Sequence, residues 1–221
     1  MGKNKLRKFS EMENFENVIQ PETYHLTDDI SLKGTWNTNF FKNENPIVLE
    51  LGCGKGEYSV SLAERYPEKN FIGIDIKGNR MWKGVTDSIK MGLENIAFLR
   101  IRIENIEKCF SENEISEIWI TFPDPQIKKR REKKRLTHPI FLKKYSSFLQ
   151  KEGIINLKTD SQFLYGYTLG IIEGHKHKLL DCVEDIYGVH QLRQDMDVKT
   201  HYEKIYLEKE TPITYMKFSL K

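Results

Sequence analysis

Short apolar runs alternate with longer amphipathic segments along most of this chain of 221 residues. Apolar runs bounded by Gly, Pro, Asn or Asp are typical of buried strands, whereas apolar residues spaced three and four apart are typical of helices. The expected strands are 46–51, 70–76, 95–101, 117–122, 153–159, 179–185 and 213–220. The expected helices are 57–66, 78–92, 138–150 and 161–176.

The alternation of strands with helices predicts an α/β fold. Strands separated by helical crossovers run parallel, and the helices cover both faces of the sheet. We therefore expect a central, mostly parallel sheet of seven strands. No clear helix separates the last two strands, so they are expected to form an antiparallel pair at one edge, connected by a long loop over 187–204.

The first 45 residues lack this alternation and are mostly polar. We expect residues 1–45 to form an extension with little core content. A chain of this length suits one domain, which we place at 46–221.

Composition narrows the class of protein. The apolar share is 38%, enough for a sizeable core, and the formal net charge is only +3, so clusters of positive charge matter more than the total. The three cysteines are far apart, and the six histidines show no ligand spacing, so neither a disulfide nor a metal is expected. No membrane span or signal peptide is recognisable, and we expect a cytoplasmic protein, either a monomer or a homodimer.

A glycine-rich turn follows the first expected strand. The stretch "LELGCGKGEY" places Gly52, Gly54 and Gly56 between a strand and a helix. Such a turn lets the backbone approach a ligand closely and directs helix N–H groups toward it. The spacing matches neither the dinucleotide fingerprint nor a P-loop. A tight turn without a ligand is the alternative.

Two carboxylates accompany this turn. Asp75 ends the second expected strand, where a carboxylate can accept both hydroxyls of a ribose. Glu50 lies inside the first motif, where it would repel a phosphate and attract an ammonium group. A ligand with a ribose and an ammonium group but no phosphate is S-adenosylmethionine. The adenine contact stays open among Glu104, Asn105 and backbone, and Glu104 could equally be a surface charge.

The fourth expected strand ends in "ITFPDPQ". Prolines on both sides of Asp124 restrict the backbone, and a carboxylate held there can accept hydrogen bonds from guanine N1–H and N2–H₂. Guanine N7 already has a lone pair, so alignment with a methyl donor would suffice for attack. The methylated ring gains positive charge, which a nearby anion stabilises. Alternatively, Asp124 only caps the next helix.

Seven basic residues among eight positions follow in "KKRREKKR", from Lys128 to Arg135. Because the run begins a few residues after Asp124, it would place phosphate-binding charge at the mouth of the pocket. The alternatives are a solvated surface or a nuclear-localisation patch.

These motifs together resemble one family, the bacterial tRNA (guanine-N7)-methyltransferases, which modify the guanine of the variable loop. The matching stretches are "LELGCGKGEY", "FIGIDI", "ITFPDPQIKKRREKKRLTHPIFLKKY", "INLKTDS" and "THYEKIYLEKETPITYMKF". The resemblance implies a Rossmann-like class I methyltransferase fold, S-adenosylmethionine as cofactor, and tRNA as substrate and partner.

The resemblance also implies roles for the matching residues. By the resemblance, Glu50 and Asp75 bind the cofactor, and Asp124 is the catalytic or guanine-positioning acid. From their positions after the ends of expected strands, Gly52, Gly54, Glu104 and Asp124 are also expected to bind the cofactor. Those expected to contact the substrate are Lys128, Asp160, Thr200, His201, Tyr202 and Glu203. Those expected to bind RNA are Arg130, Arg131, Glu132, Lys133, Lys134 and Arg135.

The sequence departs from the family at two positions. Gln126 stands where the family usually has Trp, and Arg102 stands where the family has an acid near the adenine. Two rival functions remain: a class I methyltransferase for another base atom of RNA, and a non-catalytic RNA-binding protein on the same fold.

Overall fold

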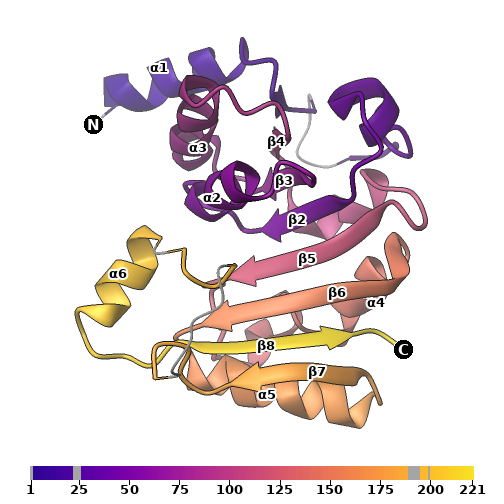
Figure 1. The fold of residues 1–221 in the computed structure, drawn as a ribbon. Coiled ribbons are helices and arrows are strands. Elements are labelled where there is room, and N and C mark those ends of the chain that lie inside the picture. Colours follow the sequence, from indigo (N-terminus) through magenta and orange to yellow (C-terminus); the bar gives the residue numbers. More distant parts are fainter. Residues whose placement is uncertain (1, 22–25, 189–194, 199) are drawn as a thin grey trace.

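The computed structural model describes residues 2–21, 26–188, 195–198 and 200–221, which form helices around one sheet (Figure 1). Within these residues the sheet has eight strands in the order β1-β4-β3-β2-β5-β6-β8-β7. The strands are β1 (Val18–Ile19), β2 (Ile47–Leu51), β3 (Asn70–Ile74), β4 (Ile96–Leu99), β5 (Ile115–Thr121), β6 (Leu149–Thr159), β7 (Lys178–Val183) and β8 (Thr214–Ser219).

The predicted sheet type is confirmed. All neighbouring strands from β1 to β6 are parallel, and β8 runs antiparallel to both β6 and β7. The sheet has one strand more than expected because β1, in the N-terminal segment, pairs with β4. Its two residues are too few to produce a recognisable pattern.

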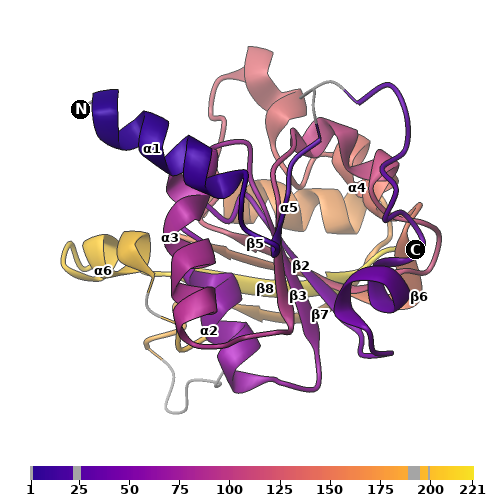
Figure 2. The same ribbon diagram turned by 90° about the horizontal axis from the view of Figure 1, so that it is seen from above.

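Helices cover both faces of the sheet (Figure 2). Those in the described residues are α1 (Gly2–Met12), α2 (Glu57–Arg65), α3 (Gly78–Lys90), α4 (Pro139–Tyr145), α5 (Gln162–Gly174) and α6 (His201–Leu207). Helices α1, α2 and α3 pack on one face, and α4 and α5 on the other, so each face has its own hydrophobic core. None of these helices is long and apolar enough to cross a membrane.

Helix α6 corrects the prediction of a loop over 187–204. It begins at His201, inside that range, and the side chain of Thr200 caps it by accepting a hydrogen bond from the Glu203 N–H at 3.2 Å. Thr followed three residues later by Glu is a known signature of a helix start, so the sequence did carry this signal. Residues 189–194 and 199 of the expected loop lie outside the described residues.

The N-terminal segment contributes to the core, contrary to the expectation of little core content. Met12 and Trp36 are almost completely buried, Phe41 is 8% exposed, and residues Trp36–Phe41 form a short π-helix. The Trp36 indole N–H donates to the backbone oxygen of Cys109 at 2.9 Å, and its ring stacks on Phe110.

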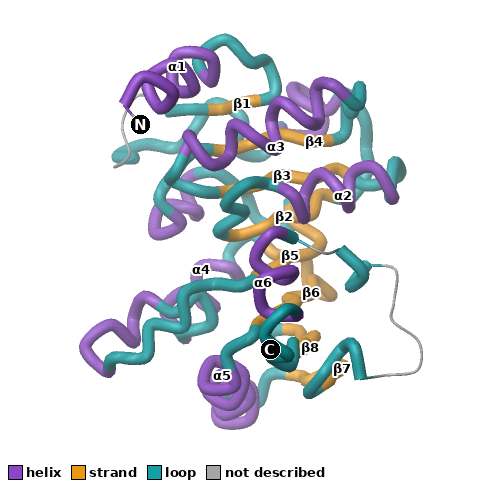
Figure 3. The backbone as a smooth tube through the Cα atoms, turned by 90° about the vertical axis from the view of Figure 1, so that its left-hand side faces the viewer, coloured by secondary structure: helices purple, strands orange, loops and turns teal. Residues whose placement is uncertain are grey.

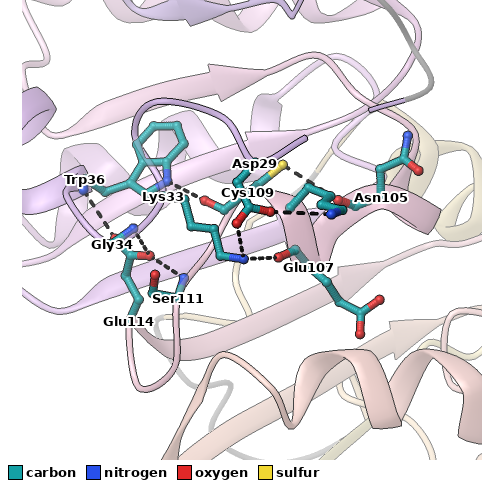
Figure 4. Close-up of polar contacts among 10 residues, drawn as sticks. Asp29, Lys33, Gly34, Trp36, Asn105, Glu107, Cys109, Ser111 and Glu114 are labelled. Atoms are coloured by element: carbon teal, nitrogen blue, oxygen red, sulfur yellow. Dashed lines mark hydrogen bonds and ion pairs between the residues drawn. The ribbon is translucent and has the colours of Figure 1, made fainter. Parts of the chain in front are cut away.

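Polar contacts attach the same segment to the residues between β4 and β5 (Figure 4). The Glu114 carboxylate accepts from the Gly34 and Trp36 N–H groups at 2.9 and 3.2 Å. The Lys33 amino group bridges the Asp29 carboxylate and the Glu107 backbone oxygen, at 3.0 and 2.9 Å. This segment is therefore an integral layer of the fold.

Replacing Trp36 tests this integration. We expect Trp36→Ala to lower the free energy of unfolding by about 3–5 kcal/mol, because it leaves a cavity and an unpaired Cys109 carbonyl. Urea unfolding measures the change. Leu6→Ala on α1 is the control, since Leu6 is 73% exposed, and it should alter stability by less than about 0.5 kcal/mol. Equal small effects of both variants would contradict the integration.

Candidate active site

The largest cleft near the predicted motifs lies at the carboxyl ends of the parallel strands, where ligands bind in open α/β sheets. Figure 3 looks onto this edge, with α6 in front of the ends of β5 and β6. The cleft has a volume of about 500 Å³. It is lined by the glycine turn, Asp75, the turn at 122–126, Asp160, Thr200 and Tyr206.

The glycine turn is open toward the cleft. Gly52 and Gly54 have φ angles of +76° and +55°, and a Cβ on Gly52 would find no atom within 4 Å. Gly56 differs, because a Cβ there would lie 2.6 Å from the Phe98 ring. The first two glycines therefore leave space for a ligand, whereas the third lets α2 and α3 pack closely.

Asp75 holds this turn in shape. Its carboxylate accepts hydrogen bonds from the Gly54 N–H at 2.9 Å and from the Lys77 N–H at 2.8 Å. The side chain is half-buried and lines the cleft. That Asp75 binds ribose hydroxyls stays a prediction.

Glu50 lies beneath the turn and is 5% exposed. Its carboxylate accepts from the Thr121 hydroxyl at 2.6 Å, from the Ser59 N–H at 3.0 Å and from the Ser59 hydroxyl. Burial raises the pKa of Glu50 to about 7, although these hydrogen bonds oppose the shift. Glu50 thus joins β2, β5 and α2, and a cationic ligand in the cleft would favour its ionised form.

A second recess of about 300 Å³ continues the cleft, and both are lined by Gly52, Asp75, Gln126, Lys134 and Leu136. Four of its other lining residues are apolar: Ile76, Ile101, Ile103 and Phe141. Glu104 and Arg102 also line it, and both are exposed. The apolar residues of this recess, next to Asp75, suit an adenine ring. The residues present therefore fit S-adenosylmethionine.

Asp124 is exposed and faces the same cleft from the end of β5. Its carboxylate accepts from the backbone N–H of Gln126 at 3.1 Å and from the Gln126 amide at 2.8 Å. Phe122 and Gln126 have φ angles of +46° and +47°, which are strained for residues other than glycine. Gln126, at the position where the resemblance predicts Trp, thus contacts the acid through both its backbone and its side chain.

Aromatic rings reach the cleft from elsewhere. Phe122 stacks on Tyr206 of α6, with ring centroids 5.8 Å apart and an interplanar angle of 20°. Burial raises the pKa of Asp160, and a hydrogen bond with the side chain of Tyr206 partly opposes this shift. The sequence carried no signal for Tyr206, because it lies on α6, and the segment that contains α6 was expected to be a loop as far as residue 204.

Of the predicted substrate residues, Asp160 and Thr200 line the cleft. His201 is exposed, and its backbone N–H donates to Glu57 at 2.8 Å. The side chain of Tyr202 lies outside the described residues.

Glu203 does not line the cleft and is buried, which disagrees with a direct substrate contact. It is fully buried, 2.6 Å from the Lys158 amino group, and it accepts from the Tyr187 hydroxyl at 2.7 Å. The same Lys158 donates to the Met196 backbone oxygen at 2.6 Å. An unpaired charge at this depth would be costly, so the pair fixes α6 onto β6.

The basic run is mostly exposed, forming a 3₁₀ helix over Lys129–Lys134 that begins after Lys128. Lys128, Arg130, Arg131, Lys133 and Lys134 are exposed, and Glu132 is half-buried. Arg135 is only 4% exposed and disagrees with the predicted RNA contact. Its guanidinium donates two hydrogen bonds to the backbone oxygen of Gln126 instead.

No group of three or more His, Cys, Asp or Glu side chains that could hold a metal ion occurs in the described part of the chain.

The arrangement of sheet, glycine turn and carboxylates defines the class: a class I methyltransferase fold. The crystal structure of the 16S rRNA methyltransferase KamB has this fold, with a TM-score of 0.67 at 12% identity over 89% of this chain and 96% of that chain.

Sequence comparison identifies the particular family. The profile of the family described as "Putative methyltransferase" matches residues 44–216. The tRNA (guanine-N(7)-)-methyltransferase of Christiangramia forsetii is 56% identical over 100% of this chain and 99% of its own. That of Bacteroides fragilis is 48% identical over 100% of this chain and 87% of its own. The chain belongs to the tRNA (guanine-N7)-methyltransferase family, and S-adenosylmethionine is its cofactor.

The buried Glu50 predicts a pH dependence of stability. The folded protein holds the Glu50 proton more tightly than the unfolded chain, whose carboxyl has an ordinary pKa of 4.5. The contribution of Glu50 to the free energy of unfolding therefore falls as pH rises from 4.5 to about 7. The total fall is on the order of 3 kcal/mol, and the contribution no longer changes with pH above about 7.

Urea unfolding of the wild type and Glu50→Gln across this pH range measures the effect. The variant should lack this part of the pH dependence, since its amide does not titrate. Parallel pH profiles for the two proteins would show that Glu50 ionises normally.

Proposed function

We propose that this chain transfers the methyl group of S-adenosylmethionine to N7 of the variable-loop guanine of tRNA, position 46. One observation carries the proposal: Asp124 shares a single cleft with Asp75 and the open glycine turn, and a basic segment begins four residues after it. The names of the relatives support the same reaction on tRNA.

The cofactor supplies an electrophilic methyl group on a sulfonium. Asp124 accepts hydrogen bonds from guanine N1–H and N2–H₂, replacing those that Gln126 now donates. No side chain needs to remove a proton from N7, so the protein contributes alignment. The Asp124 carboxylate also stabilises the positive charge that the ring acquires.

The remaining walls of the cleft hold the base and its ribose. The stacked rings of Phe122 and Tyr206 offer an aromatic surface at the cleft, and Asp160 and Thr200 add polar groups on the α6 side. The exposed cations among residues 128–134 bind phosphates near the cleft and thereby position the tRNA without reading its sequence.

We also propose that the protein acts in the cytoplasm as a monomer or homodimer. All three cysteines are free thiols, and Cys182 is exposed, which suits a reducing compartment. We place the methyltransferase domain at residues 46–221, and the described residues before it add β1 to its sheet and Trp36 to its core.

Incubation with labelled S-adenosylmethionine and tRNA tests the reaction. We expect N7-methylguanosine as the only labelled nucleoside, and no label in a tRNA whose variable-loop guanine 46 is replaced by adenine. Label on another atom would identify a different RNA methyltransferase. Absence of any transfer, with tRNA binding intact, would favour a non-catalytic RNA-binding protein.

Replacement of Asp124 tests its role. We expect Asp124→Ala to lower kcat on tRNA by about 100-fold or more, because the base loses its alignment and the product charge its counter-ion. Asp124→Asn keeps the shape and one acceptor, so its loss of kcat should be smaller. Calorimetric titration with S-adenosylmethionine checks that both variants still bind the cofactor. Near-normal turnover of Asp124→Ala would remove Asp124 from the mechanism.

A further inference from the structure

Arg135 is the last residue of the basic run and the one whose surroundings differ from the rest. Its side chain is 4% exposed, whereas Arg130 and Arg131 are exposed. The guanidinium lies over two rings of α5, 4.8 Å from the centroid of Phe163 and 4.3 Å from that of Tyr167. A cation enclosed in this way is unavailable to a phosphate.

The donors of this guanidinium are directed back toward the Pro-Asp-Pro turn. Nε and Nη2 donate to the backbone oxygen of Gln126 at 3.3 and 3.1 Å, and Nη2 also reaches the oxygen of Ile127 at 3.5 Å. Nη1 lies 3.5 Å from the Glu132 carboxylate. The Arg135 guanidinium thus bridges back to Gln126, nine residues earlier. The exposed basic residues of the 3₁₀ helix lie in the loop between these two residues.

Firm contacts hold the chain immediately after Arg135. The backbone oxygen of Leu136 accepts from the Tyr145 hydroxyl at 3.1 Å. The hydroxyls of Thr137 and Thr168 are buried and 2.8 Å apart, which ties the next residue to α5. Arg135 therefore extends from a part of the chain that is fixed to α4 and α5.

The turn that Arg135 contacts depends on such support. Gln126 has a φ of +47°, a conformation that costs free energy unless its surroundings maintain it. The same Gln126 donates both hydrogen bonds that orient Asp124. A continuous series of contacts thus leads from the rings of α5 through Arg135 and Gln126 to the Asp124 carboxylate.

We propose that Arg135 is a positioning residue for the methyl transfer, holding the backbone of Gln126 so that Asp124 faces the base, and that it does not bind RNA. This inference rests on the proposed function, because it concerns how Asp124 is held. The basic run would then have two parts: exposed cations that bind phosphate, and the buried Arg135, which holds the turn that carries Asp124.

The geometry requires arginine rather than any cation. Two donors of one planar group reach the same carbonyl while the face of that group lies on two rings, which a lysine ammonium cannot reproduce. A phosphate contact, by contrast, is largely preserved when lysine replaces arginine, because the charge remains. This difference separates the two roles.

The test compares Arg135→Lys and Arg135→Gln with the matched variant Arg130→Gln, which makes the same change at an exposed position of the run. For each protein, kcat and KM on tRNA are measured, together with the dependence of tRNA affinity on salt concentration. Circular dichroism and thermal unfolding show whether each variant is folded at the assay temperature.

We expect both Arg135 variants to lose kcat by about 10- to 100-fold, since small misplacements of an aligning group have effects of this size. Their salt dependence of tRNA binding should equal that of the wild type. Arg130→Gln should instead raise KM and reduce the slope of log affinity against log salt by about one.

Three results would overturn the inference. One is wild-type kcat in Arg135→Lys, and another is a reduced salt slope in Arg135→Gln, since each indicates a phosphate contact. The third is loss of folding in both Arg135 variants, which would make the residue a general structural requirement. Methylation of tRNA by the wild type in the same assays keeps these outcomes distinct from a failure of the proposed function.

Discussion

The structure of the active site depends on how a strained turn at the end of β5 is held in place. The turn carries Asp124 between two residues with positive φ, Phe122 and Gln126. Prolines restrict its shape but do not attach it to the rest of the protein. Attachment comes from opposite sides: Phe122 stacks on Tyr206 of α6, and Arg135 binds the Gln126 carbonyl from the side of α5. In the proposed mechanism, these two supports hold the turn so that the acid faces the base.

Buried charges recur wherever an element of the site must be fixed. Glu50 connects β2 to β5 and α2. The Lys158–Glu203 pair connects α6 to β6. Arg135, at the end of the basic run, binds the backbone of Gln126, just before that run begins. Each of these charges has a hydrogen-bonding or oppositely charged partner, which offsets the cost of its burial. The groups left exposed, Asp124 and the cations before Arg135, are those available to a substrate.

Much of the fold could be predicted because buried strands and amphipathic helices leave periodic patterns in the sequence. The parallel sheet and its antiparallel edge pair follow from those patterns. The short elements could not be predicted in this way. Strand β1 has two residues and forms by pairing with β4, and the π-helix at Trp36 packs against the core. Helix α6 lies in a polar segment without a clear apolar period. The contribution of Met12, Trp36 and Phe41 to the core was missed for the same reason.

The sequence by itself determined the chemical groups of the site, because Asp75, Asp124 and the glycines adjoin strand ends whose order along the chain brings them to one edge. The tertiary structure alone decided which charged residues are exposed. Arg130 and Arg135 belong to one basic run, yet one reaches solvent and the other is enclosed by Phe163 and Tyr167. Burial depends on residues distant in the sequence, and a pattern of charges does not reveal which of them a helix will cover.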